Sequence, residues 1–371
     1  MNLNFNAILD SLGAGAAFRI ANAARPPANY VFATFLPERP RGTYDVRSGY
    51  MTVRTTMAGL VGADSPYPPS GVMQISKFME QSAKIANRVT LPEMTIRELH
   101  ALMAAVSDAA ASNAMVTDTV LNFINKLIVQ AHLDTMEYLR SEAMTTGMID
   151  WTFNGLHLSV DYGVPAANKL ANRTGTDAYG GTTSKFWDDH RAARSLLKQQ
   201  VRAIIAHPET IDVIISNSAN NIVVLAQDPV GVTSFVRALG SPNTNNTMTT
   251  DARDRVSIVA YGLEGEIFDV ANPGQTIAVP FMPKGKIIYV GNPIPAGFVV
   301  GQGSTASPQN ELPIGYTHLA PTVEGGGTPG RWADVRVPDG NPWQIEGRGV
   351  TNGLPVMEAP ERVVILSTDM P

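Results

Sequence analysis

The chain has 371 residues, a formal net charge of −5, 44% hydrophobic residues and 16% charged residues. The apolar fraction excludes a wholly disordered chain, and the acidic balance argues against a basic nucleic-acid-binding protein. Cysteine is absent, which excludes disulfides, thiolate zinc sites, iron–sulfur clusters and a cysteine nucleophile. Because the sequence shows neither an apolar run of the roughly 18 residues that cross a bilayer nor a basic signal-peptide start, we expect synthesis in the cytoplasm.

The first 44 residues combine dense prolines with apolar side chains. Arg25-Pro26-Pro27 and Pro37-Glu38-Arg39-Pro40 would interrupt helices and sheet interiors. We therefore expect an extended N-terminal arm over residues 1–44. Its apolar residues, among them Tyr30, Phe32 and Phe35, need a surface to cover them. That surface is either the rest of the same subunit or another subunit, and the sequence leaves both alternatives open.

Residues 49–81 show the period-two alternation of a two-stranded ribbon. The apolar face is predicted to carry Met51, Val53, Met57, Met73, Ile75 and Met79. The proline-rich connection is too long for a tight hairpin turn. Since two strands alone are marginal in water, the ribbon must lie on something. We expect that it contacts a neighbouring subunit. The alternative is that it packs on the rest of its own subunit.

Helical signals begin after Pro92. Thr95 and Glu98 match a capping box and predict the start of a first helix. A second helix is expected to run without interruption over residues 114–146 and to end at Gly147. Its length of roughly 50 Å would make it a spine for the other elements. Its predicted core stripe is Val120, Phe123, Leu127 and Ala131. Glu137 and Arg140 are interpreted as an ordinary pair on the helix surface.

The rest of the chain predicts a mixture of helices and strands. Residues 151–163 indicate a hairpin around Asn154-Gly155. Further helices are expected at 187–206, 218–225 and 230–239. Strands are expected at 211–215, 257–261, 266–270, 286–290, 298–300 and 362–367. Residues 301–331, rich in Gly, Pro, Thr and Ser, are interpreted as a loop, followed by a polar approach to the last strand.

Known catalytic motifs are missing. The sequence has no GxSxG elbow, Walker A loop, HExxH helix or EF-hand loop. None of the six histidines stands at metal-ligand spacing from another: His100, His132, His157, His190, His207 and His318. The acids of Asp188-Asp189-His190 are interpreted as first-turn charges that offset a helix dipole. We therefore predict no catalytic residue, no cofactor and no metal site.

Three segments, in this order, carry a family resemblance. The first is the helix through Tyr138-Leu139 to Gly147, with the strand Leu156 to Val164 after it. The second is Phe186-Trp187-Asp188-Asp189 with the apolar stretch that ends at Ile215. The third runs from Asn341-Pro342-Trp343 to Val363-Val364-Ile365-Leu366. Together they resemble the major capsid proteins of tailed double-stranded DNA bacteriophages, which have the Johnson fold, and most closely the lambda-type major head protein family.

The resemblance implies an α+β capsid fold with five parts. These are an N-terminal arm (1–44), an extended two-stranded loop (45–92), a peripheral domain with the spine helix (93–186), an axial domain (187–335) and a return into the peripheral domain (336–371). It implies hexamers and pentamers of this chain in an icosahedral shell around phage DNA, within the virion, assembled in the host cytoplasm. Scaffolding, portal and decoration proteins would be partners, packaged DNA would lie nearby without specific contact, and no membrane would be involved.

Two other functions stay open. An encapsulin-type nanocompartment shell has the same fold and would hold an enzyme cargo instead of DNA. A soluble α+β enzyme or ligand-binding protein would be a monomer or small oligomer with a convergent polar pocket.

Overall fold

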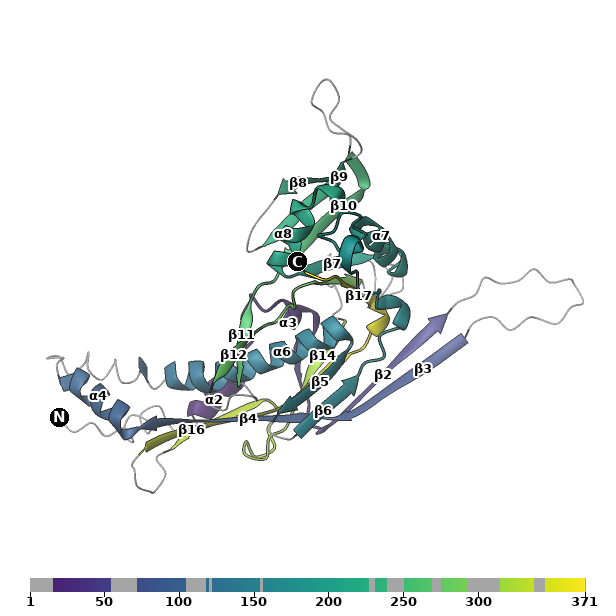
Figure 1. The fold of residues 1–371 in the computed structure, drawn as a ribbon. Coiled ribbons are helices and arrows are strands. Elements are labelled where there is room, and N and C mark those ends of the chain that lie inside the picture. Colours follow the sequence, from purple (N-terminus) through teal and green to yellow (C-terminus); the bar gives the residue numbers. More distant parts are fainter. Residues whose placement is uncertain are drawn as a thin grey trace, which may run out of the picture.

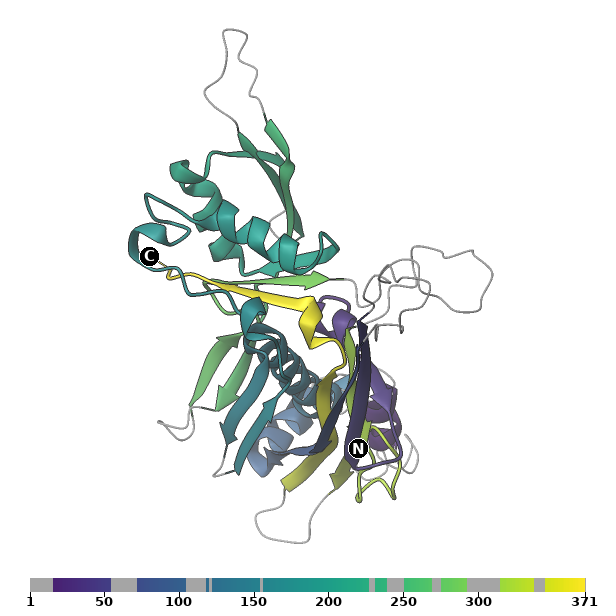
Figure 2. The same cartoon turned by 90° about the vertical axis from the view of Figure 1, so that its right-hand side faces the viewer.

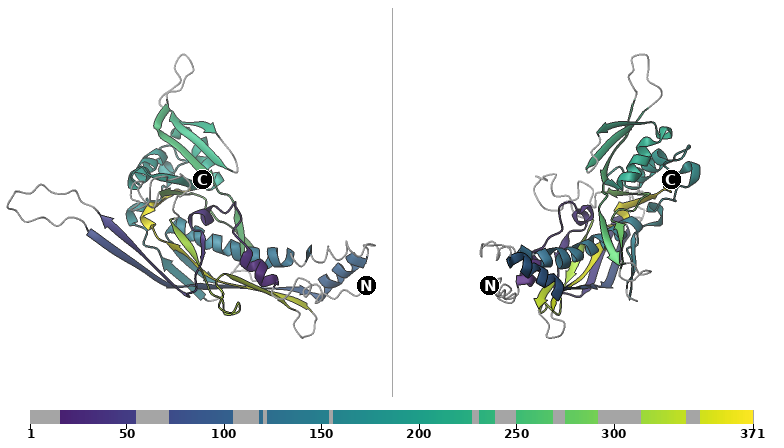
Figure 3. Two further views of the ribbon diagram at one scale, coloured as in Figure 1. Left: turned by 180° about the vertical axis from the view of Figure 1, so that it is seen from behind. Right: turned by 60° about the vertical axis from the view of Figure 1, so that its left-hand side comes forward.

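A computed structural model describes residues 16–54, 72–104, 118–119, 122–153, 156–226, 231–238, 250–268, 275–291, 314–336 and 344–370. The molecule consists of an elongated base and an upper lobe (Figure 1). Helix α6 (Gln130–Thr146) runs along the base above strands β4 (Ala83–Pro92) and β16 (Gln344–Met357). A two-stranded ribbon extends from one end of the base, and helix α4 (Glu93–Ala104) lies at the other end (Figure 3).

The sheet of the base is organised by one long strand. The first part of β16, from Gln344, pairs antiparallel with β4 on one side and with β15 (Arg331–Arg336) on the other. Its second part pairs with β14 (Gly315–Ala320), which in turn carries the short parallel strand β1 (Glu38–Pro40). The expected loop up to residue 331 and polar approach after it are therefore wrong where the structure describes them. Strands β14, β15 and β16 occupy most of that sequence.

The upper lobe contains a six-stranded sheet. Its strands follow the order β17 (Val363–Ser367), β13 (Lys286–Gly291), β7 (Val201–Ala206), β10 (Thr250–Ala260), β9 (Val232–Ala238) and β8 (Ile222–Ala226). Helices α7 (Phe186–Leu196) and α8 (Pro208–Ser216) share a buried core with one face of this sheet. Residues such as Ile205, Ile288 and Ile365 belong to a second core that includes α6. The sheet thus joins the lobe to the base.

Several local expectations in the lobe are wrong. The helix predicted over 187–206 ends at Leu196, and Lys198 and Gln199 then adopt positive φ angles of 52° and 61° before β7 begins. The strand predicted over 211–215 is helix α8. Pro208 lies in its first turn, and the His207 side chain accepts a hydrogen bond from the Glu209 backbone N–H. Both features favour the start of a helix at this point. The helices predicted over 218–225 and 230–239 are one 3₁₀ turn followed by strands β8 and β9, whose β-branched residues favour extended backbone.

Other expectations are confirmed. Strands β5 (Met148–Phe153) and β6 (Leu156–Asp161) form the predicted hairpin, although its turn residues lie outside the described part. Strands β10, β13 and β17 match predicted strands, and the predicted strand over 298–300 lies outside the described residues. Helix α4 begins at Glu93 directly after β4, so Thr95 lies inside its first turn and is not the predicted cap.

The remaining elements pack around this framework. Helices α2 (Ala16–Ala23) and α3 (Val31–Phe35) lie in the predicted arm, and β11 (Glu264–Phe268) and β12 (Thr276–Pro280) form a second hairpin. Short 3₁₀ turns occupy Ala166–Asn168, Gly175–Asp177 and Pro360–Arg362. None of the helices in the described ranges is long and apolar enough to span a membrane.

Candidate assembly surfaces

The ribbon is the most extended surface of the molecule. Strands β2 (Asp45–Arg54) and β3 (Val72–Gln81) pair antiparallel, as predicted, and join no other described strand. Figure 1 shows them leaving the base at an angle. The register sets Met51 opposite Ile75 and Val53 opposite Met73. Residues that oppose one another in an antiparallel pair belong to the same face, so the predicted apolar face is consistent with the register. Met79 stands opposite Arg47, and Met57 lies outside the described residues.

The ribbon is continuous with the base. Strand β3 ends at Gln81 and β4 begins at Ala83, so a single residue separates ribbon from sheet. Strand β4 then pairs with β16 along ten residues. The ribbon is therefore joined directly to the sheet below the spine helix.

The described part of the predicted N-terminal arm packs on its own subunit. Phe32, Phe35 and Leu36 are buried in the same core as Met136 and Leu139 of α6. The Tyr30 hydroxyl lies in a hydrogen-bonded contact with the Asp134 carboxylate, and Gln130 donates to both of them. For residues 17–46 the structure therefore favours the first of the two alternatives, in which the arm covers its own domain.

A buried ionic network ties this segment to the spine helix. Arg140 is fully buried and donates from Nε to Thr317 Oγ1 at 2.8 Å, from Nη1 to Glu137 Oε2 at 3.2 Å and from Nη2 to Glu38 Oε1 at 3.1 Å. Glu38 also pairs with Arg331, which is 2% exposed. Two acids and two arginines thus balance one another inside the protein, as buried charges must.

Backbone groups of the N-terminal segment complete the network. Glu137 Oε1 accepts from the Phe32 backbone N–H at 2.9 Å and from the Tyr261 hydroxyl at 2.8 Å. Thr317 Oγ1 donates to the Leu36 carbonyl at 2.8 Å. Burial raises the pKa of Glu137, with Arg140 opposing the shift, and burial lowers the pKa of Arg331. The interpretation of Glu137 and Arg140 as a surface pair is therefore wrong, because the sequence spacing alone does not reveal which helix face is covered.

The spine helix contains a π-helical segment, η1 (Phe123–Val129), directly before α6. Phe123 is 5% exposed and Ile128 1%, whereas Leu127 is 47% exposed. The backbone hydrogen bonds of a π-helix join residues i and i+5 instead of i and i+4. The turn therefore contains one more residue, and Ile128 reaches the core in place of Leu127. The Asn87 side chain of β4 donates to the Leu127 carbonyl at 3.0 Å and contacts His132 Nε2 at 2.8 Å, which holds this segment against the sheet. The expected burial of Leu127 is therefore wrong, Ala131 is half-buried, and Val120 lies outside the described residues.

Glycines of β16 allow the helix to lie close to the sheet. A Cβ on Gly347 would stand 2.6 Å from Phe123 and Ile128 side-chain atoms. On Gly349 it would meet His132 and Ile128 at 2.5 Å, and on Gly353 it would meet Met136 at 2.3 Å. These three glycines, which we call the glycine track, follow the helix along the strand. At its C-terminal end α6 closes with Gly147 in the left-handed conformation, at φ 77°, as predicted.

Four of the six histidines make structural contacts inside the protein. Burial lowers the pKa of His132 to about 4 and that of His190, which contacts the Tyr289 hydroxyl, to about 4. His207 caps α8, and His318 Nε2 contacts the Thr43 carbonyl at 2.8 Å. His157 is exposed beside Asp150 on the β5–β6 hairpin, and His100 belongs to α4. In the described ranges no three His, Asp or Glu side chains are grouped so that they could hold a metal ion.

Asp189 differs from its expected role. It is 2% exposed and accepts from Arg173 through two hydrogen bonds of 2.8 and 2.6 Å and from the Tyr179 hydroxyl at 3.0 Å. It therefore anchors the loop before α7 rather than merely offsetting the helix dipole. Sequence reasoning missed this anchor because Arg173 lies 16 residues away in a loop without periodicity.

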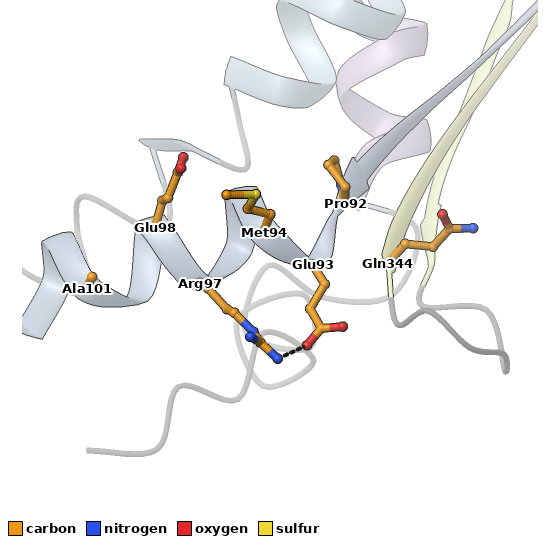
Figure 4. A pocket seen from close by; sticks show the side chains of 7 residues that line it. All are labelled: Pro92, Glu93, Met94, Arg97, Glu98, Ala101 and Gln344. Carbon is orange, nitrogen blue, oxygen red and sulfur yellow. Dashed lines mark hydrogen bonds and ion pairs between the residues drawn. The ribbon is translucent and has the colours of Figure 1, made fainter.

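A pocket opens where β4 passes into α4 (Figure 4). Its lining residues are Pro92, Glu93, Met94, Arg97, Glu98, Ala101 and Gln344. Figure 4 shows Arg97 turned toward Glu93, and the two form an ion pair of 2.5 Å. The lining contains no side-chain pair that could act as nucleophile and base, so the pocket does not support an enzymatic reading.

No family model matches the chain, and no curated protein does. Solved structures do. A protein assigned as a capsid protein of an E. coli CFT073 prophage matches with a TM-score of 0.52, 12% identity and coverage of 100% of both chains. A phage-related protein of Bordetella bronchiseptica RB50 matches with a TM-score of 0.43, 10% identity and 95% coverage of both chains. A structure from Gordonia phage Cozz matches with a TM-score of 0.45 and 12% identity, over 92% of this chain and 87% of its own.

The first of these similarities extends over the whole of both chains. It confirms the α+β fold class that the resemblance in the sequence implied. The chain therefore has the α+β fold of a phage capsid protein.

Proposed function

We propose that this chain is a major capsid protein, which self-assembles as hexamers and pentamers into an icosahedral shell around the double-stranded DNA of a tailed phage. The observation that carries the proposal is the full-length similarity in fold to the prophage capsid protein. The protein would reside in the virion and act as a structural component rather than as an enzyme. Scaffolding, portal and decoration proteins would be its partners during assembly.

The ribbon supports this proposal on physical grounds. Strands β2 and β3 form a two-stranded sheet of their own, and such a sheet is marginal in water. We propose that its apolar residues contact a neighbouring copy, through Met51, Val53, Met57, Met73, Ile75 and Met79. Burying each such side chain stabilises a contact by about 1.5–3 kcal/mol. In the same scheme residues 45–92 are the extended loop, 93–186 and 336–371 the peripheral domain, and 187–335 the axial domain.

The test is to express the chain and examine it by light scattering and negative-stain microscopy. Closed particles of uniform size support the proposal, and genome-length DNA in particles from infected or induced cells distinguishes it from a nanocompartment with enzyme cargo. A monomer or small oligomer at every concentration would contradict it.

A second experiment uses a variant of the ribbon. Residues 60–72 are replaced by a short Gly/Ser turn, which leaves the spine helix and the upper lobe unchanged. The variant should keep its helical circular dichroism and cooperative melting but lose shell formation. Normal assembly of this variant would contradict the intersubunit role, and unfolding would show that the ribbon belongs to its own core.

A further inference from the structure

Two neighbouring arginines in the base form no ion pair with any acid in the part of the chain that the structure describes. Arg39 of β1 and Arg41 just after it both lie over the ring of Tyr316, with guanidinium carbons 5.2 and 6.0 Å from its centroid. Within the described ranges no carboxylate forms an ion pair with either of them. Nine other described arginines do have carboxylate partners, whereas Arg25 donates to backbone carbonyls instead. The nine are Arg88, Arg97, Arg140, Arg173, Arg191, Arg237, Arg331, Arg336 and Arg348.

The local acid is not available to this pair. Glu38 is 7% exposed and pairs with Arg140 and Arg331 on the other face of β1. Alternation along an extended strand puts Arg39 and Arg41 on the face opposite to Glu38. Stacking on a ring holds a guanidinium in place while its N–H groups stay free to bind an anionic partner. The two guanidinium groups held on the Tyr316 ring are therefore preorganised to bind acidic groups.

A matching pair of acids lies on another part of the molecule. Glu264 and Glu266 alternate along β11, and both are exposed. Among the described residues they make one side-chain hydrogen bond, in which Thr276 Oγ1 donates to Glu266 Oε2 at 3.3 Å. Residues i and i+2 of a strand are about 6.6 Å apart. Each pair therefore stands two residues apart on an extended segment, on one face of its strand.

The two pairs lie on different sides of the subunit. In Figure 2 the green β11–β12 hairpin is on the left, and the purple N-terminal part of the chain is on the right. A head-to-tail ring requires complementary surfaces on different sides of each subunit. Pairs of opposite charge fit that requirement, and they also fix the register of docking.

We infer that the Arg39/Arg41 pair of one copy binds the Glu264/Glu266 pair of the next copy within a ring of this chain. The inference rests on the proposed function, because it assigns a contact within the proposed shell. Arg39 is half-buried, and Arg41, Glu264 and Glu266 are exposed. Charges at such a surface contribute to the rate and register of docking more than to affinity, so the contact guides assembly and weakens at high salt.

Charge exchange tests this pairing on the full-length chain. The variants are R39E/R41E, E264R/E266R and the combination of all four changes, with R39K/R41K as the charge-preserving control. We expect each double reversal to raise the protein concentration needed for shells about tenfold or more, since like charges then face one another. The combined variant should assemble near the wild-type concentration, and so should R39K/R41K. Circular dichroism of every variant verifies that the subunits are folded.

Three results would overturn the inference. One is assembly of both double reversals at the wild-type concentration. Another is a combined variant that folds but assembles no better than either double reversal. The third is R39E/R41E shells of normal yield with reduced DNA content, which would assign the arginines to phosphates instead. If the unaltered chain forms no shells, the proposed function fails first, so the two failures are distinguishable.

Discussion

Replacing Arg140 with methionine tests the buried network most sharply. The substitution keeps the volume of the stem but removes the guanidinium, which makes hydrogen bonds to Thr317, Glu137 and Glu38. Glu137 then stays buried with no cation within hydrogen-bonding distance among the described residues. Removing one partner of a buried ion pair costs about 3–5 kcal/mol, because the remaining charge is uncompensated. Since domains are stable by only about 5–15 kcal/mol, this is a large fraction of the total.

The loss should depend on pH. Burial already raises the pKa of Glu137 above its ordinary value of 4.5, and Arg140 opposes this shift. Without Arg140 the pKa of Glu137 rises further. An acid with a raised pKa in the folded state favours folding at pH values below its unfolded pKa, and this contribution is lost as pH rises through the folded pKa. The deficit of the variant should therefore be largest at neutral pH and shrink as the solution is acidified toward pH 4.5.

Urea denaturation of wild type and Arg140→Met at several pH values measures this effect. Each curve is recorded at several protein concentrations, because assembly adds stability by mass action. Arg140→Lys is the matched control: it keeps the charge but cannot reproduce three hydrogen bonds from one planar group, so its loss should be intermediate. A loss below about 1 kcal/mol for Arg140→Met, the size of an exposed pair, would refute the reasoning. So would a deficit that stays constant from neutral pH to pH 5.

Three further predictions concern the spine helix and its surroundings. Gly349→Ala places a Cβ 2.5 Å from side-chain atoms of His132 and Ile128 and should lower the free energy of unfolding by about 1–3 kcal/mol. The control Gly42→Ala, whose Cβ would have nothing within 4 Å, should change it by less than about 0.5 kcal/mol. Equal effects of the two variants in thermal melts would contradict the close packing of the helix on the glycine track. Ile128→Ala should cost about 2–5 kcal/mol and Leu127→Ala clearly less, since their exposures are 1% and 47%; the reverse order would show that the helix has a regular α register. Because burial lowers the pKa of His132 from 6.5 to about 4, its neutral form stabilises the fold above pH 6.5, and this contribution is lost as pH falls from 6.5 through 4. His132→Gln should flatten the pH dependence of the melting temperature in that range, and an unchanged slope would contradict the assignment.

The ribbon, the hairpin and the end of the spine helix could be predicted because each has a strong local signal. The alternation of Met51 and Val53, and of Met73 and Ile75, indicates paired strands, and Gly147 suits the left-handed turn that it adopts. The order of these parts was also enough to suggest the fold class. Such features depend on a few neighbouring residues, so tertiary packing does not change them.

The errors have tertiary causes. The stripe through Phe123 and Leu127 follows regular α-helical spacing, but Asn87 and the glycine track select a π-helical register that brings Ile128 inward. The segment after α7 was expected to continue the helix, yet Val201–Ala206 pairs with β13 and β10 from more than 40 residues later in the chain. The ionic network of Glu38, Glu137, Arg140 and Arg331 joins segments up to 293 residues apart in the sequence, and no local pattern marks it.

Cryo-electron microscopy of the particles formed by the purified full-length chain tests the central claim most directly. The account predicts a closed icosahedral shell in which the β2–β3 ribbon of each copy lies on a neighbouring copy. Particles without such a shell, or a shell in which every ribbon folds back onto its own subunit, would contradict it.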